Sequence, residues 1–562
     1  MNLLTDSWIP VRRIDDTQDS ITPLDLLQDF EDNPVQRIDS VRPDFDGSLY
    51  QFLIGLYQIL LSPINEEEWW DYFENIPKLE QLQERIDLLI PAFELDSGEH
   101  RFMQDTRLPF LSKSKNGKIK DKRVDIRECF LDYTSSPFVK EGTIRKICPK
   151  CATAALITVQ LNATGGGRGH RESIRKGGPL TTLVFSLGPE ERLWKTILLN
   201  ILTITEYPTQ ANLSDFWKEG IQNLRLVFPW LEENPTSDNK EDVVYPLESS
   251  DRTSKLGLHP YHVYWNVPRR LLLDFQDTES GVCDLCGETS NSLVHKFWWM
   301  NHGASYERSL WRHPLTPYSI NKNNELQPEG GGAEPLIYRN WMGYVVDRAD
   351  GLKDISPATV VQCCMRRMEG EARISDLKVY AFGYAASKAK VRYWQDALYP
   401  TIRLPEEFLE DFLRNVKQII SCAVDVEEIL KMYFVQAYIG DQKSNEKSGK
   451  RKRKISTLEL SQEFWSRTEP EFYQTISSIA TAILEESSEE AILSRKRAWL
   501  DTILRTAKSE LFPEFVPFIT NGATNPERVA QAHIRLNMQL TRNNKKICED
   551  LGVSNNMPRE SL

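Results

Sequence analysis

Two Cys-x-x-Cys pairs constrain the fold of this chain more than any other feature of its sequence. Cys148 and Cys151 form the first pair, Cys283 and Cys286 form the second, and 131 residues separate the pairs. A gap of two residues lets both thiolates of a pair face one metal ion, and two pairs supply the four sulfurs of a structural zinc site. The sequence therefore predicts a zinc site that joins two distant segments, with reduced thiols that bind no metal as the alternative.

The other five cysteines lack a partner at metal-binding spacing. A disulfide framework is rare inside the cell, so these thiols are expected to behave as small apolar core residues. We predict that five cysteines lie in the core: Cys129, Cys363, Cys364, Cys422 and Cys548.

The N-terminus and the apolar runs indicate a cytoplasmic protein that does not enter the membrane. The first ten residues, MNLLTDSWIP, lack the basic start of a signal peptide and include an early aspartate and proline. The best apolar run, residues 53–61, is far shorter than the roughly 20 residues that span a bilayer.

The first 400 residues predict an α+β domain that carries the zinc site. Residues 152–161 and 180–188 are rich in β-branched residues, which favours strands on either side of a glycine-rich segment. Residues 47–61 and 77–93 space their apolar side chains as a helix does. Because strands and helices do not alternate regularly, the pattern is typical of an α+β domain over 1–400.

After residue 400 the pattern becomes helical, and we predict a four-helix bundle over 401–562. The sequence predicts that the basic segment 441–455 is a linker between the first two helices. Asn525 can cap the last helix, because asparagine oxygens accept backbone N–H bonds and proline suits the first turn. The expected helices are 405–440, 456–486 with a break near Pro470, 489–512 and 526–551.

The glycine-rich segment, residues 162–179, reads NATGGGRGHRESIRKGGP and holds six glycines and four basic residues against one glutamate. It does not match a P-loop or a dinucleotide fingerprint, since Lys176 precedes a glycine and His170 stands where the third glycine is required. Glycines let a backbone approach a surface closely, and basic side chains neutralise phosphate. The composition indicates entry into a DNA minor groove, with charge from Arg168, Arg171, Arg175 and Lys176.

The net charge of -12 is unusual for a protein that binds nucleic acid. The basic residues, however, gather in residues 113–123, 162–179, 387–392 and 443–454. An acidic body with local basic segments is typical of a subunit that contacts nucleic acid at a few places.

A zinc-dependent nucleobase deaminase is the enzymatic alternative. His170 and Glu172 match the H-x-E part of that motif, and Cys283 with Cys286 would supply the thiolates. Against it, Val282 replaces the expected proline, and the pair Cys148 and Cys151 would have no role.

Several motifs, taken in order, resemble the CasA family, the large subunit of the type I-E CRISPR surveillance complex Cascade. The resemblance covers most of the chain, including the C-terminal helices. The motifs are MNLLTDSWIPV (1–11), RFMQ (101–104), CPKC, TGGGRG with KGGPLTTLV (164–184), CDLCG, LWRHPLTP (310–317) and FGYAASKAKVR (382–392).

The resemblance implies a subunit without catalytic activity. Such a subunit contacts the 5′ handle of the CRISPR guide RNA, recognises a short protospacer-adjacent motif (PAM) in double-stranded target DNA, and opens the duplex so that an R-loop forms. It works beside other Cascade protein subunits and helps to recruit a helicase-nuclease. These functions imply antiviral defence.

The resemblance also assigns roles to individual residues. The family contacts the PAM through a glycine loop and splits the next base pair with a wedge. The family wedge is commonly a glutamine, whereas this chain has a lysine, and Lys296 is a doubtful match for a minor-groove lysine of the family. An aromatic residue, here Phe138 in residues 130–143, contacts the guide handle. The residues assigned to the loop and wedge are Thr164, Gly165, Gly166, Gly167, Arg168, Ser387, Lys388 and Ala389.

Overall fold

The computed structural model describes most of the chain, and its contacts divide the chain into two compact units. The first unit holds Met1–Leu336, Gly343–Ala349 and Lys353–Tyr399, and the second holds Ile337–Met342, Asp350–Leu352 and Pro400–Leu562. The description leaves out 29–31, 112–122, 134–142, 166–168, 189–191, 209–212, 219, 239–241, 248–255, 333–334, 347–354, 369–375, 388–389, 440–455, 516–524 and 554–562.

Helix α1 (Pro43–Leu61) is the centre of the first unit, and nearly all of its side chains are buried. Pro43 suits the first turn, and Asp44 lies near the positive end of the helix dipole. The helix predicted over 47–61 is thus confirmed. Helix α5 (Pro149–Leu161) packs against α1, where Thr158 Oγ1 lies 3.0 Å from Ser48 Oγ.

The prediction of a strand over 152–161 is wrong, because this segment lies within α5. Every residue of α5 from Cys151 onward is buried. The run therefore lacks the regularly spaced polar residues that would distinguish a helix from a strand in the sequence. Pro149 at the first helical position and the alanines 152, 154 and 155 favour the helix.

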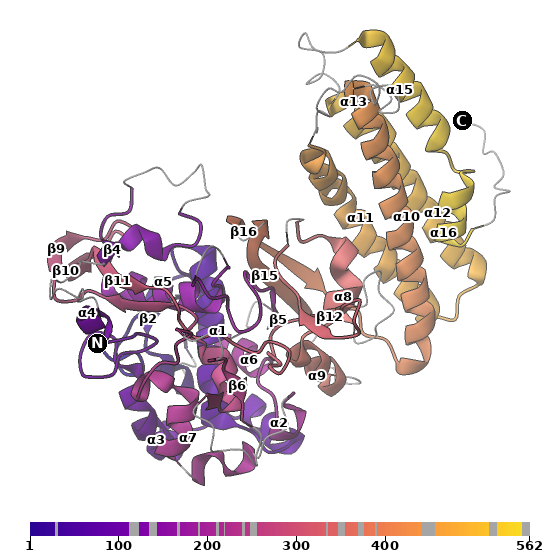
Figure 1. Cartoon of the computed structure of the whole chain (residues 1–562). Coiled ribbons are helices and arrows are strands. Elements are labelled where there is room, and N and C mark those ends of the chain that lie inside the picture. Colours follow the sequence, from indigo (N-terminus) through magenta and orange to yellow (C-terminus); the bar gives the residue numbers. More distant parts are fainter. Residues whose placement is uncertain are drawn as a thin grey trace. The chain divides into compact units, whose positions relative to one another are not determined.

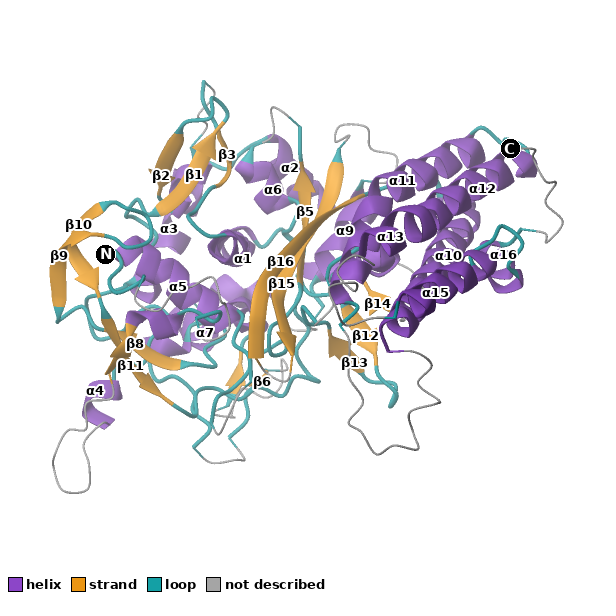
Figure 2. Cartoon of the chain, turned by 90° about the horizontal axis from the view of Figure 1, so that it is seen from above, coloured by secondary structure: helices purple, strands orange, loops and turns teal. Residues whose placement is uncertain are grey.

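The strand predicted over 180–188 is confirmed as β5 (Thr181–Ser186). It pairs antiparallel with β15 (Leu377–Ser387), and β16 (Lys390–Pro400) lies on the other side of β15. The three strands are the long sheet in the middle of Figure 2. This sheet brings the end of the glycine-rich segment close to the end of β15.

Five smaller sheets complete the β-structure of the described residues. Their strand orders are β2-β1-β3, β4-β11-β8, β10-β9, β13-β12-β14 and β6-β7. The strands are β1 (Ile9–Arg13), β2 (Gln18–Ile21), β3 (Val35–Ile38), β4 (Arg123–Asp125), β6 (Tyr245–Pro246), β7 (Gly257–Leu258), β8 (Arg270–Leu273), β9 (Thr278–Val282), β10 (Thr289–Val294), β11 (Lys296–Met300), β12 (Tyr318–Ile320), β13 (Leu326–Pro328) and β14 (Ile355–Ser356).

Shorter helices complete the described chain before residue 400. Residues 77–93, predicted as one helix, form α3 (Leu79–Leu89) followed by a 3-10 turn at Ile90–Phe93, where Pro91 cannot continue the hydrogen bonding. The other helices are α2 (Glu66–Glu74), α4 (Leu108–Leu111), α6 (Leu193–Leu198), α7 (Ile221–Val227), α8 (Trp341–Val345) and α9 (Thr359–Arg367).

The second unit is helical, as the sequence predicts, and its long helices pack against one another (Figure 1). Phe412, Val416, Ile419 and Ala423 form part of its core. The helices are α10 (Glu406–Ile439), α11 (Leu458–Leu484), α12 (Glu489–Arg505), a π-helical stretch at Thr506–Leu511, α13 (Phe512–Phe515), α15 (Pro526–Gln539) and α16 (Lys545–Leu551).

Two details of the predicted helices are wrong. Helix α11 continues through Pro470 without a break, because Phe464, Trp465 and Phe472 on both sides of the proline are buried on one face. Their packing outweighs the lost hydrogen bond. Residues 526–551 form two helices, because Asn544 starts α16 by accepting a bond from the Ile547 N–H. The cap by Asn525 is confirmed, since its side chain accepts from the Glu527 N–H.

A short segment before residue 400 also belongs to the second unit. Tyr338 is fully buried, and its ring stacks on Phe472 with 4.3 Å between centroids. Trp341 donates from Nε1 to the Pro400 carbonyl at 2.8 Å. The helical unit therefore includes an aromatic segment that the helical pattern of the sequence does not reveal.

No single helix among the described residues has the length and hydropathy of a membrane span. Helices α1 and α2 pass that test only as a pair, and the pair is bent by 118°.

Candidate functional site

The four predicted metal ligands lie together in the first unit. Cys148 is the residue before α5 and Cys151 lies in its first turn, while Cys283 and Cys286 lie in the turn between β9 and β10. The four sulfur atoms are all within 4.8 Å of one another, and three of the four residues are buried. The cluster could therefore hold a metal ion.

The backbone around the cluster is held by hydrogen bonds between the two segments. The Cys148 N–H donates to Cys283 Sγ at 3.3 Å. The Asp284 carboxylate accepts from the backbone N–H groups of Arg145 and Lys146 at 2.7 and 2.9 Å. These bonds fix the turn of the second pair against the chain that precedes the first pair.

The donor set fits a cation that prefers sulfur. The Sγ atoms of Cys148 and Cys286 are 3.7 Å apart, close to the about 3.8 Å expected between ligands of a tetrahedral zinc with bonds near 2.3 Å. Hydrogen bonds from Cys148 and then Cys151 lower the pKa of Cys283, while the bond with Cys148 raises the pKa of Cys151. A metal ion that binds here would replace thiol protons, because the thiolate is the form that ligates a metal.

The remaining cysteines are confirmed as core residues. Each of the five predicted positions is buried: Cys129, Cys363, Cys364, Cys422 and Cys548.

The glycine-rich segment connects α5 to β5. Thr164 is nearly buried and Gly165 follows it, whereas Gly166, Gly167 and Arg168 lie outside the described residues. The segment turns at Gly169, which has φ +82°, and at Gly178, which has φ +65°, so both positions favour glycine.

The prediction that Arg175 neutralises phosphate is wrong, because this side chain is part of the core. Its guanidinium donates to Thr181 Oγ1 at 2.8 Å and to Gln51 Oε1 at 2.7 Å, and only 2% of the residue is exposed. Burial lowers its pKa to about 9. Two further acceptors, Thr316 Oγ1 and the Leu161 carbonyl, complete the four polar partners of this arginine beneath the segment.

The end of β15 lies beside the glycine-rich segment. A methyl group added at Gly178 would lie 3.5 Å from Thr164 Cγ2 and 3.7 Å from Ala386 Cβ. Residues 330–332, a glycine run that the sequence analysis overlooked, connect the two: Gly331 donates to the Gly178 carbonyl at 2.9 Å, and Ala386 donates to the Gly332 carbonyl at 2.8 Å. Ser387 ends β15, while the side chain of Ser387 and all of Lys388 and Ala389 lie outside the described residues.

Arg269 contacts the start of the segment and Trp299, and His170 of the segment packs near the same tryptophan. Arg269 donates from Nη2 to the Thr164 carbonyl, and its guanidinium lies 5.6 Å from the centre of the Trp299 ring. The centre of the His170 ring lies 5.8 Å from the centre of the Trp299 ring. Arg269 is 7% exposed, and burial lowers its pKa to about 10. Within the described part of the chain, its Nε and Nη1 have no hydrogen-bond partner.

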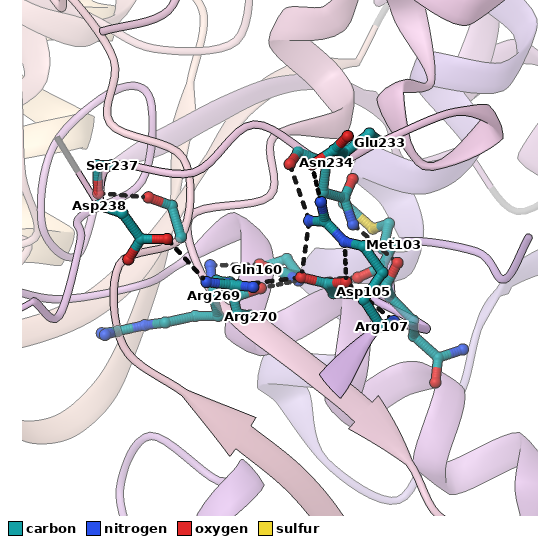
Figure 3. Close-up of polar contacts among 12 residues, drawn as sticks. Met103, Asp105, Arg107, Gln160, Glu233, Asn234, Ser237, Asp238, Arg269 and Arg270 are labelled. Atoms are coloured by element: carbon teal, nitrogen blue, oxygen red, sulfur yellow. Dashed lines mark hydrogen bonds and ion pairs between the residues drawn. The ribbon is translucent and has the colours of Figure 1, made fainter. Parts of the chain in front are cut away.

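The strand that carries Arg270, next to Arg269, is anchored by a buried carboxylate. Figure 3 shows Asp105 between Arg107 and Arg270, to which it is bonded at 2.8 and 3.0 Å. The neighbouring Gln160 of α5 donates to the Met103 carbonyl and accepts from the Arg269 N–H. The backbone at Arg269 is therefore fixed on two sides.

Lys296 lies away from the glycine-rich segment. It begins β11, opposite Asp125 of β4, whereas the residues that follow the other end of β11 touch the segment. His302 donates from its backbone to the Gly169 carbonyl at 2.8 Å, and a methyl group at Gly169 would lie 2.8 Å from Asn301 Cβ. The His302 contact is a backbone hydrogen bond, so no residue type in the sequence marks it.

The segment that includes Phe138 is described only at its base, and Phe138 lies outside the described residues. At that base, Asp132 accepts from Arg42 at 3.0 Å, and Arg42 also pairs with Asp44 at 2.9 Å. Tyr384 of β15 donates to the same Asp44. Burial, and then the Asp44 charge, raise the pKa of Tyr384 well above its usual value, so the phenol stays a donor.

The deaminase alternative is overturned by the geometry of its proposed ligands. Cys283 and Cys286 share their cluster with Cys148 and Cys151, and His170 is not part of that group. Glu172, the glutamate of the H-x-E sequence, instead pairs with Arg308 at 2.5 Å. The H-x-E sequence and the thiolates thus lie in separate places.

Known proteins of one family resemble this chain in sequence and in fold. The family described as CRISPR-associated protein Cse1 matches residues 2–509. The solved structure of Thermus thermophilus CasA (Cse1) is 17% identical, with a TM-score of 0.64 over 96% of this chain and 100% of that one. Thermobifida fusca Cse1 is 15% identical, with a TM-score of 0.63 over 98% of each chain. A chain of a CRISPR RNA-guided surveillance complex is 15% identical, with a TM-score of 0.61 over 96% of this chain and 99% of that one.

An α+β unit followed by a helical unit is the fold of this chain, and that fold is similar to the fold of these proteins. The chain belongs to the Cse1 family of CRISPR-associated proteins, also called CasA, and the predicted resemblance is confirmed.

Proposed function

We propose that this chain is the non-catalytic large subunit of a CRISPR RNA-guided surveillance complex. It recognises a PAM in double-stranded DNA, promotes opening of the duplex, and helps to recruit a helicase-nuclease. Membership of the Cse1 family supports the proposal, as does the likeness to a chain of such a complex. The observation that carries it is the contact between the glycine-rich segment and the end of β15 around Gly178 and Ala386.

In this proposal the two neighbouring segments divide the work. Gly165 to Gly167 approach the minor groove, where side chains would obstruct entry, and Thr164 and Arg168 flank them. Ser387, Lys388 and Ala389 form the wedge between β15 and β16. Lysine donates hydrogen bonds but cannot accept them, so this wedge separates bases by its bulk and its charge.

The guide RNA handle is proposed to contact the segment around Phe138, whose ring would stack on an unpaired base. Arg42 and Asp44 support this assignment, since they join Asp132 at the base of that segment to Tyr384 in β15. The guide contact and the wedge would then rest on one buried group of charges.

The cysteine cluster is proposed to hold zinc with a structural role. Four protein sulfurs complete a tetrahedral coordination shell and leave no position for a substrate. Other Cascade protein subunits complete the site around the guide RNA.

The test compares one change in the glycine loop with one in the wedge. Gly166→Asp adds bulk and a negative charge where the backbone meets DNA, so motif-dependent binding should be abolished in the reconstituted complex. Lys388→Ala should leave the motif contact and slow strand separation, since unpairing costs about a few kcal/mol that a wedge partly offsets. Duplex binding and strand opening are measured for both variants.

A duplex that is pre-opened by mismatches beside the motif separates the two roles. Pre-opening should rescue Lys388→Ala much more than Gly166→Asp. Equal rescue of the two variants, or full activity of both, would contradict the assigned roles.

A further inference from the structure

A polar hollow of about 240 Å³ lies directly after the glycines of the glycine-rich segment. We call it the phosphate hollow, and its lining includes His170, Arg171, Glu172, Ser173, Tyr306 and Arg308. The proposed roles of the loop and wedge do not use these residues.

Two arginines give the phosphate hollow an excess of positive charge. Arg308 pairs with Glu172 at 2.5 Å, and both side chains are partly exposed. Arg171 donates from Nε to Ser237 Oγ at 2.7 Å and from Nη2 to the Ser237 carbonyl at 3.4 Å, which occupies two of its five N–H donors. Burial, and then the charge of Arg269, lower the pKa of His170, so this ring is neutral near pH 7.

A buried hydroxyl in the hollow lacks a hydrogen-bond partner. Ser173 is 1% exposed, and among the described residues its Oγ has no partner. Its backbone is fixed, because the Ser173 N–H donates to the Ala163 carbonyl at 3.0 Å. Buried hydroxyls normally have a partner, so the Ser173 hydroxyl is available to donate to an acceptor that enters the hollow.

Glu172 links the hollow to the glycines on either side of it. A methyl group at Gly177 would lie 3.2 Å from the Glu172 carboxylate and 3.0 Å from the Gly165 nitrogen. A methyl group at Gly165 would collide with Glu172 Oε1. The absence of side chains at both positions leaves room for this carboxylate beneath the segment.

We propose that the phosphate hollow binds one backbone phosphate of the duplex whose minor groove meets the glycine-rich segment. Arg308 and Arg171 neutralise the phosphate, Ser173 Oγ donates to it, and Glu172 is the counterion that Arg308 exchanges for it. The inference rests on the proposed function and adds to it a site for the DNA backbone.

The exchange makes binding at this position selective. Without DNA, Glu172 neutralises Arg308 and reduces the attraction of the hollow for any passing phosphate. When the motif holds the duplex in register, contacts between the phosphate and the two arginines replace the ion pair of Arg308 with Glu172. Losing that pair costs little, because exposed ion pairs contribute little to stability. The hollow therefore strengthens binding of a correctly placed duplex more than that of a misplaced one.

The test uses the reconstituted complex with duplexes that carry one methylphosphonate, a neutral phosphate analogue, at each position around the motif in turn. For the unmodified protein, one position should weaken binding. For Arg308→Gln, the methylphosphonate at that position should weaken binding less than it does for the unmodified protein, and the slope of log affinity against log salt should become shallower by about 0.9. Arg308→Lys keeps the charge and should keep the slope.

Glu172→Gln tests the exchange itself. This variant should bind duplexes without the motif more tightly than the unmodified protein and should bind motif duplexes at least as well. The control is the ion pair of Arg225 and Glu232, which has a 2.9 Å contact and an arginine with the same 48% side-chain exposure as Arg308. Arg225→Gln and Glu232→Gln should change neither the salt slope nor the methylphosphonate pattern.

Two results would overturn the inference and are distinguishable. If the unmodified complex binds duplexes without regard to the motif, the proposed function fails and the inference fails with it. If motif-dependent binding is present but Arg308→Gln retains the full methylphosphonate pattern, the phosphate site alone is wrong.

Discussion

The cysteine cluster and the glycine-rich segment both join distant parts of the chain, but they are supported differently. At the cluster, Cys286 lies 138 positions after Cys148, and four identical ligand atoms lie within 4.8 Å of one another. At the glycine-rich segment, Arg308 lies 136 positions after Glu172, and each contact uses a different side chain. The cluster is closed around its own ligands, whereas the segment leaves an exposed hollow beside it.

The difference determines how each region responds to substitution. One metal ion would connect all four cysteines, so any ligand loss should affect the whole cluster and the stability of the first unit. The supports of the segment are separate ion pairs and hydrogen bonds, so single changes should affect DNA binding more than folding. Four predictions test this contrast.

Cys283→Ser should have the largest effect. Structural metal binding contributes on the order of 10 kcal/mol, so loss of one thiolate should lower the free energy of unfolding by about 5 kcal/mol or more. Metal content should fall from about one equivalent per chain. Cys129→Ser is the control, since this cysteine is buried outside the cluster and should cost about 1–3 kcal/mol with metal content unchanged. Equal losses of stability in the two variants, or a metal-free protein of full stability, would contradict the role of the cluster as a single metal-linked support.

Asp105→Asn should cause the second largest loss of stability. It leaves Arg270, which is 4% exposed, without its buried counterion, and such a loss costs about 3–5 kcal/mol. Thermal unfolding should show the loss while metal content stays constant. Asp277→Asn is the control, because its pair with Arg123 is half exposed and should contribute less than about 1 kcal/mol.

The pH dependence gives a second measurement for Asp105. Burial raises its pKa, but hydrogen bonds and charges from Arg107 and Arg270 outweigh burial and lower it below the usual value. Asp105 therefore binds a proton more readily in the unfolded chain than in the folded one. The stability that its carboxylate contributes is complete above about pH 4 and is lost as pH falls below that value. Asp105→Asn should flatten the stability profile below pH 4, and an unchanged profile would contradict this role.

Gly169→Ala and Gly287→Ala compare the two regions directly. Both glycines have positive φ, +82° and +76°, so alanine should cost about 1–2 kcal/mol at either position. At Gly287 nothing lies within 4 Å of the added methyl, whereas at Gly169 it would lie 2.8 Å from Asn301 Cβ. Gly169→Ala should therefore be the more destabilising in chemical denaturation and should also weaken duplex binding. Equal costs would mean that Asn301 moves aside freely.

Gly165→Ala should have the smallest effect on stability. The methyl meets the end of a flexible glutamate, which can move, so the free energy of unfolding should change by less than about 0.5 kcal/mol. Duplex binding should nevertheless change, because Glu172 leaves Arg308. In a protein that already carries Gly165→Ala, the change Glu172→Gln should have no further effect on duplex binding, and additive effects would contradict this coupling.

The cluster and several elements could be predicted from the sequence because each depends on a local pattern. Cysteine spacing places two thiolates together, and the apolar period of α1 and α10 identifies these helices. Helix α5 was mistaken for a strand because a segment that is buried on all sides has no polar face to mark its period. Pro470 indicated a break that the buried residues around it prevent.

The supports of the glycine-rich segment could not be predicted because they come from elsewhere in the chain. Arg269 lies 105 residues after the Thr164 carbonyl that it binds, and no motif marks it as a partner of the segment. Arg175 belongs to the same basic run as Arg171, yet one is in the core and the other lines the hollow. Only the tertiary fold separates them, since composition is the same for both.

The distance between the cysteine pairs also has a consequence in time. Cys148 and Cys151 leave the ribosome before their partners, and the 131 residues between the pairs take about 7–26 s to synthesise at 5–20 residues per second. During that interval the first pair holds at most half of the cluster, so the cluster cannot close until Cys286 has been made. A nascent chain that stops before this point exposes two thiols that the finished protein buries.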